Sequence, residues 1–403
     1  MGARAIALGG AYVGVAEDYT ALTYNPAGLT QVRRTEFAGV FERRSLDSRN
    51  VYLGHEESTP LDVTRIQSIG FAYPFPTYRG ALVVGFSFDR VAPLDQEYFR
   101  SGSDPALGVA AEEERISEDG SLNAFRAGFA IEANPGLSVG VTGVIMTGSS
   151  RREREFYYRS DDNLDREDTF STSDIDYTAV TGSLGALLVL DRHTRFGLSL
   201  HLPESFDLTG SGYDDIYRIQ ADPVDTLDLL GDYTFEDEIG LPFRLSAGLS
   251  HVRDLPIGGS KPGSILAALD VTYADWSQID YAGRLRTPDR EFVYRATLDV
   301  HAGLEYTFPA PFPLRLRGGY SRQPIPYRLI ATDVFFSEAS KAKFDPDRHS
   351  WSFGIGALLQ EAATLDLTYV SGGYERRGAS DFGLTANERL DEDRLVVGLA
   401  FRL

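Results

Sequence analysis

Apolar and polar residues alternate with a period of two in many separate parts of this chain. In the C-terminal stretch RLVVGLAFRL, one face carries Leu395, Val397, Leu399, Phe401 and Leu403. Arg394 and Arg402 lie on the opposite face. A period of two is typical of a β-strand whose two faces meet different surroundings. No long stretch shows the 3.6-residue period of an amphipathic helix, so the pattern predicts an all-β protein.

The same alternation extends over residues 292–308, which would span roughly 50 Å as one strand at ~3.3 Å per residue. Strands of soluble proteins are usually about half that length. Further apolar faces are Phe125, Ala127, Phe129 and Ile131; Phe196, Leu198, Leu200 and Leu202; Phe243, Leu245, Ala247 and Leu249; Ile265, Ala267, Leu269, Val271 and Tyr273; Trp351, Phe353, Ile355, Ala357 and Leu359; and Leu365, Leu367 and Tyr369. So many long, one-sided strands are hard to cover in a soluble fold.

The links between these strands alternate in length. Short, turn-like links fall at 74–80, 133–136, 191–194, 254–263, 309–313 and 360–363. Long polar links fall at 47–63, 93–119, 150–172, 205–240, 276–290, 325–347 and 374–390. Tight turns on one side and long loops on the other are typical of bacterial outer-membrane barrels. The sequence therefore predicts a transmembrane antiparallel β-barrel of about 14 strands with long extracellular loops.

Composition agrees with a barrel and excludes several other classes. The 403 residues carry a formal net charge of -20 and no cysteine. The acidic balance argues against nucleic-acid binding, which depends on Lys and Arg clusters. No apolar run approaches the ~18 residues of a membrane-spanning helix. No signal peptide follows Met1, so we expect an exported chain to correspond to a mature form.

Candidate catalytic or metal chemistry is sparse. The six histidines are scattered, at His55, His193, His201, His251, His301 and His349. Their spacing does not match a zinc site, and we expect no enzyme activity, no metal and no cofactor. The acidic run SDDNLDRED at 160–168 lacks the ligand spacing of a calcium loop and favours a solvated loop. RREREFYYR at 151–159 either binds lipopolysaccharide phosphates through arginine or extends a strand with paired charges.

The polar faces of the predicted strands would line the barrel interior. They carry Arg195, Arg244, Arg295, Arg315, Arg317 and Arg394, alternating with Asp270, Asp299, Glu305 and Asp366. His301 lies beside Asp299 and Glu305, and with Arg295 we interpret these residues as a polar network in the lumen rather than a charge relay. Such a lining suits either a water-filled pore or a lumen whose charges pair with a plug.

The N-terminal stretch ALTYNPAGLT, residues 21–30, is rich in small and turn-forming residues. Asn25 and Pro26 suit a tight turn, because Asn tolerates unusual backbone angles and Pro restricts φ. Ala27 and Gly28 are small enough to pack in a crowded space. The stretch is either a frayed terminus or a plug enclosed by the strands, and the many strands that follow favour a plug.

Several motifs together resemble the FadL-type family of outer-membrane transporters for long-chain fatty acids and other hydrophobic compounds. The opening GARAIALGGAYVGVAEDYTALTYNPAGLT resembles the family's N-terminal hatch, which ends in Asn-Pro-Ala. FGLSLHLPESFDLTG, LDVTYADWSQID with Trp276 and Ser277, LRLRGGYSRQPIP and FDPDRHSWSFGIGALL resemble later strands of that family. The resemblance touches nearly the whole chain.

The resemblance implies a hatch over residues 1–33, with Asn25, Pro26, Ala27 and Gly28 on the ligand path, inside a barrel over residues 34–403. It also implies passive uptake of a hydrophobic small molecule, such as a long-chain fatty acid or hydrocarbon, across the outer membrane. The ligand would be captured from outside, pass a moving hatch and leave laterally through the wall. Contacts with outer-membrane lipid and lipopolysaccharide are expected. A scaffold role in protein secretion or surface assembly, with a partner on the extracellular loops, and a general porin remain alternatives.

Overall fold

The computed structural model describes residues 1–162, 164–221, 224–255, 263–282, 290–308, 313–331, 346–359, 362–379 and 385–403. The strands are β1 (Glu36–Tyr52), β2 (His55–Phe75), β3 (Leu82–Pro93), β4 (Gln96–Asp104), β5 (Val109–Asn134), β6 (Leu137–Ser160), β7 (Arg166–Val189), β8 (Thr194–His201), β9 (Glu204–Ala221), β10 (Val224–Leu241), β11 (Arg244–Leu255), β12 (Gly263–Asp275), β13 (Asp280–Ala282), β14 (Arg290–Tyr294), β15 (Ala296–Thr307), β16 (Leu314–Gln323), β17 (Tyr327–Ala331), β18 (Arg348–Leu359), β19 (Ala363–Ala379) and β20 (Thr385–Arg402). The helical elements are α1 (Ala3–Ala7), α2 (Ala21–Tyr24), η1 (Pro26–Gln31), η2 (Pro105–Leu107) and η3 (Trp276–Gln278).

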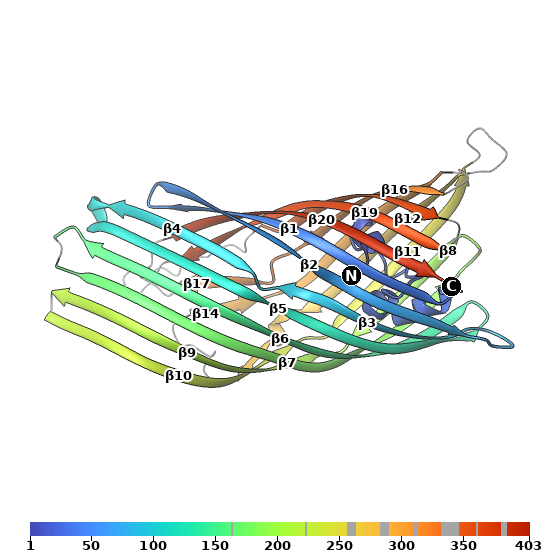
Figure 1. Cartoon of the computed structure of the whole chain (residues 1–403), viewed down its shortest axis with the longest axis horizontal. Coiled ribbons are helices and arrows are strands. Elements are labelled where there is room, and N and C mark those ends of the chain that lie inside the picture. The colour runs from blue at the N-terminus through green and yellow to red at the C-terminus, as the bar shows by residue number, and fades with distance from the viewer. Residues whose placement is uncertain are drawn as a thin grey trace.

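These strands form a closed antiparallel barrel of 14 wall strands, as the alternation of link lengths predicted. Some wall strands are interrupted and count as two elements, namely β3–β4, β8–β9, β10–β11, β12–β13, β14–β15 and β16–β17. The first and last strands close the ring, with Glu36 paired to Arg402 and Val51 paired to Asn387. Figure 1 shows that the strands run obliquely to the long axis of the barrel.

In the part of the chain that the structure describes, the longest helical elements have five or six residues, and none could cross a membrane as a helix.

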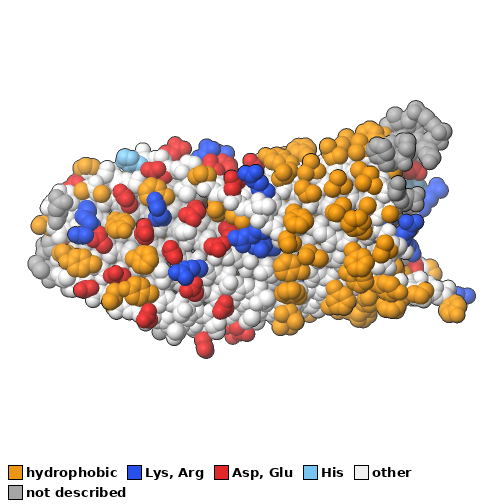
Figure 2. Space-filling model, in the orientation of Figure 1, with side chains coloured by type: hydrophobic (Ala, Val, Ile, Leu, Met, Phe, Trp, Pro, Cys, Tyr) orange, Lys and Arg blue, Asp and Glu red, His pale blue; other side chains and the backbone are white. Residues whose placement is uncertain are grey.

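The predicted apolar faces point outward. Phe125, Leu298, Phe353 and Phe401 are each about half exposed, while the residues that precede the first three, Ala124, Thr297 and Ser352, point to the opposite face and are buried. On the side of the molecule that Figure 2 shows, hydrophobic side chains gather in a broad band over one half of the barrel, which we call the apolar belt. We call this half, which includes the short turns and both chain termini, the belt half (Figures 1 and 2). An apolar band between polar surfaces is the outer face expected of a barrel in lipid.

The other half, which we call the extended half, begins beyond the outward-facing Phe41, Ile66 and Ile145 and carries charged residues on its surface (Figure 2). The prediction of long loops is wrong in this half. The predicted links at 47–63 and 150–172 are hairpins, since β2 begins three residues after β1 ends and β7 begins six residues after β6 ends. Strands also cover most of the predicted links at 93–119 and 205–240. The predicted links at 276–290, 325–347 and 374–390 lie partly outside the described residues.

The strands continue past the belt because their backbone groups still find partners across the ladder. Their side chains there are polar on both faces, as in the pair of Arg43 with Asp62 at 3.3 Å. Cross-strand pairs of opposite charge stabilise such hairpins in water. The loss of apolar alternation made these strands look like loops in the sequence.

The single strand predicted over residues 292–308 is interrupted. Arg295 separates β14 from β15, and its backbone N–H donates to the carbonyl of Pro326. Among the described residues β14 pairs only with β17, and the two form a separate two-stranded sheet.

Residues 1–33 lie inside the belt half, and Figure 1 shows their short helices enclosed by the strands. None of residues 1–32 is more than partly exposed. Their apolar side chains, including Leu8, Tyr12 and Leu22, pack with Ala72, Val83, Ala130, Leu266 and Ala268 from the wall.

Candidate functional site

Ten glycines on the inner wall contact the N-terminal segment, residues 1–33, and we call them the glycine belt. A Cβ at Gly319 would lie 2.1 Å from the backbone nitrogen of Gly9, and a Cβ at Gly70 would lie 1.7 Å from the ring of Tyr19. The same holds, at no more than 2.8 Å, for Gly128, Gly140, Gly185, Gly197, Gly248, Gly303, Gly354 and Gly398. These glycines come from ten different strands. The backbone of the wall therefore approaches the segment on nearly all sides, and at these positions it leaves no room for a side chain.

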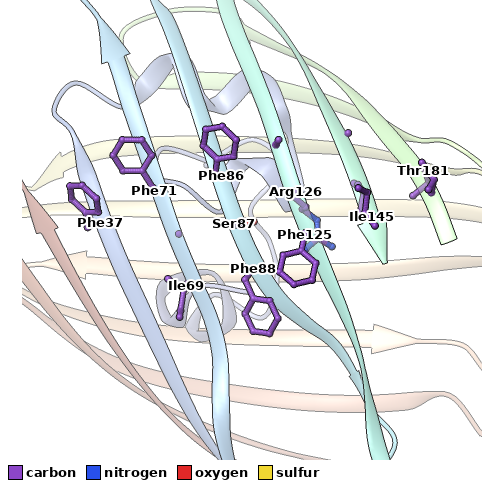
Figure 3. A pocket seen from close by; sticks show the side chains of 15 residues that line it. Phe37, Ile69, Phe71, Phe86, Ser87, Phe88, Phe125, Arg126, Ile145 and Thr181 are labelled. Atoms are coloured by element: carbon purple, nitrogen blue, oxygen red, sulfur yellow. The ribbon is translucent and has the colours of Figure 1, made fainter. Parts of the chain in front are cut away.

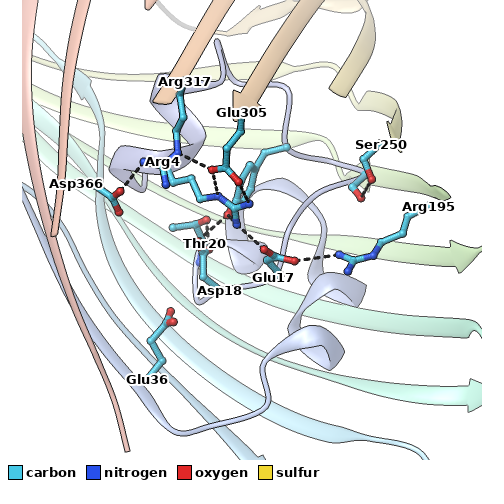
Figure 4. A network of polar contacts seen from close by, with 12 residues as sticks. Arg4, Glu17, Asp18, Thr20, Glu36, Arg195, Ser250, Glu305, Arg317 and Asp366 are labelled. Atoms are coloured by element: carbon cyan, nitrogen blue, oxygen red, sulfur yellow. Dashed lines mark hydrogen bonds and ion pairs between the residues drawn. The ribbon is translucent and has the colours of Figure 1, made fainter. Parts of the chain in front are cut away.

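Ion pairs tie the N-terminal segment to the wall (Figure 4). Arg4 makes two hydrogen bonds to Glu305 of β15, both 2.9 Å, and a third of 2.6 Å to Glu17 of the segment. Glu17 also accepts from Arg195 of β8 at 3.1 Å, and Glu305 accepts from Arg317 of β16 at 2.6 Å. Opposite charges that leave water must pair in this way, because an isolated buried charge is costly.

The carboxyl group of Glu17 responds to this environment. Burial by itself would raise its pKa, but the guanidinium groups of Arg4 and Arg195 outweigh burial and lower the pKa to about 2. Glu17 is therefore charged near neutral pH, and its charge holds two arginines from different elements.

The residues named at the hatch, Asn25 to Gly28, lie at the centre of this contact. Asn25 is fully buried, and its side-chain N–H groups donate to the carbonyls of Val13 at 2.9 Å and Ala186 at 3.0 Å. Pro26 begins η1, whose first free N–H, from Ala27, donates to the side chain of Asn25 at 3.2 Å. A Cβ at Gly28 would lie 2.6 Å from Ala16. Asn25 thus fixes both the turn and its position against β7.

The four residues assigned to a lumen network lie in different places. Glu305 binds Arg4, and His301 lies with Nδ1 2.7 Å from the carbonyl oxygen of Gly9, so both contact the N-terminal segment. Asp299 lies near Arg244 instead. Arg295 donates to the carbonyl of Ile325 at 3.1 Å and lies 3.6 Å from Asp347, at the break between β14 and β15.

An apolar strip covers part of the inner wall beyond the N-terminal segment. It comprises Ala124, Val144, Met146, Ala179, Phe206 and Leu208, and we call it the inner strip. Leu122, Ile175, Tyr177 and Ile239 pack against it. The strip runs across β5, β6, β7 and β9, on the face opposite to the outward-pointing Phe125 and Ile145. This strip was not predicted, because the inner face of the barrel was expected to be polar. The signal was available, since GVIM at 143–146 is apolar on both faces.

The wall next to the inner strip is incomplete. The ladder between β2 and β3 ends at the pair of Ser68 with Asp89, and β4 pairs with β5 but, among the described residues, not with β2. We call the interface of β4 and residues 90–93 of β3 with residues 55–67 of β2 the seam. Side chains join its two sides: Gln67 donates to the carbonyl of Arg90 at 2.9 Å, and Ser101 donates to Glu57 at 3.0 Å.

On the outside, an apolar groove of about 660 Å³ opens in the belt where the seam begins (Figure 3). Its walls include Phe37, Ile69, Phe71, Phe86, Phe88 and Phe125, and Ala127 and Gly143 leave space between them. Ile69 and Phe88 adjoin Ser68 and Asp89, where the ladder ends. Val144 lines both this groove and the inner strip, so only one strand layer separates them.

The apolar side chains of the groove and of the inner strip offer contacts to an apolar molecule. Among the described residues, no group of three His, Asp or Glu side chains could hold a metal ion. Segment 151–159 forms the end of β6, where Arg154 binds Glu114 at 2.7 Å and Arg159 binds Asp168 at 2.8 Å. Residues 160–162 and 164–168 of the acidic run form the next turn and the start of β7.

Solved structures of outer-membrane transporters share this fold. A FadL homologue of Pseudomonas aeruginosa matches with a TM-score of 0.65 and 13% identity, over 98% of this chain and 97% of the other. The toluene transporter TodX of P. putida matches with a TM-score of 0.63 and 15% identity, over 100% and 98%. The toluene transporter TbuX of Ralstonia pickettii matches with a TM-score of 0.58 and 15% identity, over 100% and 98%.

Neither a protein-family model nor a curated protein matches the sequence. At 13–15% identity the structural matches establish the fold, and they confirm the FadL-type resemblance at that level.

Proposed function

We propose that this protein is a passive transporter of hydrophobic small molecules across the bacterial outer membrane. The single observation that carries the proposal is the inner strip, a buried apolar cluster on the inner side of a barrel whose other inner residues are mostly polar or small. A water-filled porin has no use for such a cluster, whereas an apolar molecule beside it gains about 25 cal/mol for each Å² of apolar surface that is removed from water. The fold it shares with two toluene transporters supports the same class of ligand.

Residues 1–33 act as the hatch in this proposal, and residues 34–403 form the barrel. The glycine belt and the ion pairs of Arg4 give the hatch contacts on nearly all sides. Asn25, Pro26, Ala27 and Gly28 form the part nearest to β6 and β7, the strands that also carry Val144 and Ala179 of the inner strip. A molecule on the inner strip is therefore blocked by the hatch on the side of the belt half, and it needs another exit.

The seam supplies this exit. Val91 of β3, which packs against the inner strip, lies at an irregularity of the β3–β5 ladder directly beside the end of the β2–β3 ladder. The outer groove begins at the same place and faces the apolar belt. A hydrophobic molecule that passes the seam enters the groove and then the lipid, down its concentration gradient and without an energy source. Lipid and lipopolysaccharide are the expected surroundings of the belt and the extended half.

The experiment compares two leucines that both face the lumen. Leu208 belongs to the inner strip, whereas Leu46 of β1 is equally buried but lies outside it. Leu208→Asn should reduce toluene uptake by cells producing the protein by about tenfold, because it places a polar group on the route at a cost of roughly 1–3 kcal/mol. Leu46→Asn should leave uptake nearly unchanged. Equal uptake by both variants and the wild type would reject the proposed route.

The alternatives give different results in the same strains. A general porin would admit a small sugar as readily as toluene, and a scaffold for secretion would show no uptake of either. The hydrophobic transporter admits toluene alone.

A further inference from the structure

Two arginines lie at the edge of the inner strip, and both already have carboxylate partners. Arg244 of β11 donates to Glu204 of β9 at 2.6 Å, and Glu204 precedes Phe206 of the strip by two residues on the same face. Arg126 of β5 donates to Asp89 of β3 at 2.7 Å and pairs in register with Val144 of the strip.

Further groups complete the charge balance at this edge. Asp89 also accepts hydrogen bonds from Ser68 at 2.7 Å and from Ser87 at 2.8 Å. Asp299 lies within electrostatic reach of Arg244, and His201 pairs in register with Arg244. The edge therefore holds cations whose charge is already compensated.

We infer that the inner strip selects uncharged hydrophobic molecules over anionic ones, and that Glu204 and Asp89 set this selectivity by occupying Arg244 and Arg126. The inference rests on the proposed function and specifies its substrate class. An incoming carboxylate must compete with Glu204 or Asp89 for its arginine, because each of these carboxylates already accepts an N–H of that arginine. The displaced carboxylate would then stay buried without its partner, since the two side chains are only 10% and 2% exposed. Breaking a buried ion pair in this way is strongly unfavourable. A hydrocarbon needs no such exchange, because it contacts only apolar side chains.

The test uses toluene and benzoate, which share one ring and differ in charge at pH 7.5. Binding of each to the purified, detergent-solubilised protein is measured by equilibrium dialysis with labelled ligand. The wild type should bind toluene at least about tenfold more tightly than benzoate. Glu204→Gln frees Arg244, which is 41% exposed, and should strengthen benzoate binding by about tenfold or more, the typical effect of one charge-assisted hydrogen bond. Toluene binding should change less than about twofold.

Glu238→Gln is the matched control. Glu238 lies on the outer face of β10, is exposed and accepts a hydrogen bond from Ser205, so its loss changes the net charge equally without freeing a lumen arginine. It should bind both ligands as the wild type does. Asp89→Asn is a second test variant, because it removes the carboxylate partner of Arg126. The strand signal in circular dichroism verifies that each variant is folded.

The outcomes separate the two proposals. Wild-type protein that binds benzoate as tightly as toluene would overturn the selectivity and leave the transport function standing. Folded Glu204→Gln and Asp89→Asn variants that both fail to gain benzoate binding would also overturn it. Wild-type protein that binds neither ligand would remove the proposed function itself, and the selectivity with it.

Discussion

The belt half and the extended half of the barrel differ in how completely their walls are hydrogen-bonded. In the belt half every wall strand is laddered to both neighbours, from β1–β2 around to β19–β20 and β20–β1. In the extended half, among the described residues, β4 pairs only with β5, and β14 pairs only with β17. Hydrocarbon offers no partner for a free backbone group, so the belt half must be closed. Water satisfies such groups in the extended half, which can therefore contain a seam.

The lumen follows the same division. In the belt half it is filled by the N-terminal segment, with backbone against backbone at the glycine belt. Beyond the segment, buried side chains lie along the wall, and they include both the inner strip and a cluster of Arg100 with Glu112 and Glu114 at 3.1 and 2.7 Å. We therefore expect the belt half to be the fixed part of the molecule, and in the proposed transport we expect movement to be confined to the seam and the strands beside it.

We expect the largest effect from a substitution in the glycine belt, which tests whether the N-terminal segment closes the belt half. Gly319→Ala places a Cβ 2.1 Å from the nitrogen of Gly9, a backbone atom that cannot move aside cheaply. We expect it to weaken the seating of residues 1–33 by at least about 1–3 kcal/mol and to raise ion conductance in planar bilayers. Gly318→Ala is the control, because a Cβ there meets nothing within 4 Å and should change stability by less than about 0.5 kcal/mol. Equal conductance for both variants would mean that the segment does not block the lumen.

Locking the seam tests the extended half. The chain has no cysteine, so Glu57→Cys with Ser101→Cys introduces one pair across the seam, where the two native side chains are 3.0 Å apart. If movement at the seam admits the ligand to the groove, the oxidised variant should lose most toluene uptake and regain it on reduction. Ser121→Cys with Ser149→Cys, a pair within the β5–β6 ladder, is the control. Full uptake by the oxidised seam variant would place the exit elsewhere.

The smallest expected effect concerns pH and the hold on the N-terminal segment. The folded-state pKa of Glu17, about 2, lies below the ordinary value near 4.3, so its ion pairs contribute fully above pH ~4.3. The stabilisation by these ion pairs is lost as the pH falls towards 2. Its size is modest, because the Glu17 side chain is partly exposed to solvent. A spin label at Gln31→Cys should therefore become more mobile between pH 5 and pH 2.5. Adding Glu17→Gln should make the label mobile at both pH values. If the variant shows the same change of mobility with pH as the parent protein, another titrating group causes that change.

Much of the belt half could be read from the sequence. Side-chain direction in a strand depends only on the parity of the residue number, so the alternation in β15, β18 and β20 predicted the outward faces correctly. The short turns were also predictable, because Gly136 and Gly80 take positive φ values that favour glycine. The order of strands followed from these two local signals.

The contacts that make the site depended on tertiary structure. Arg4 and Glu305 lie 301 positions apart, and no local signal pairs them. The glycine belt was present in the sequence as one glycine on most polar faces, but only the shared tilt of the closed barrel brings these glycines to one level around the segment. Strand extension was hidden for a related reason. Beyond the apolar belt the outward side chains are also polar, so hydrophobic alternation no longer marks a strand, and pairing with the neighbouring chain segment decides.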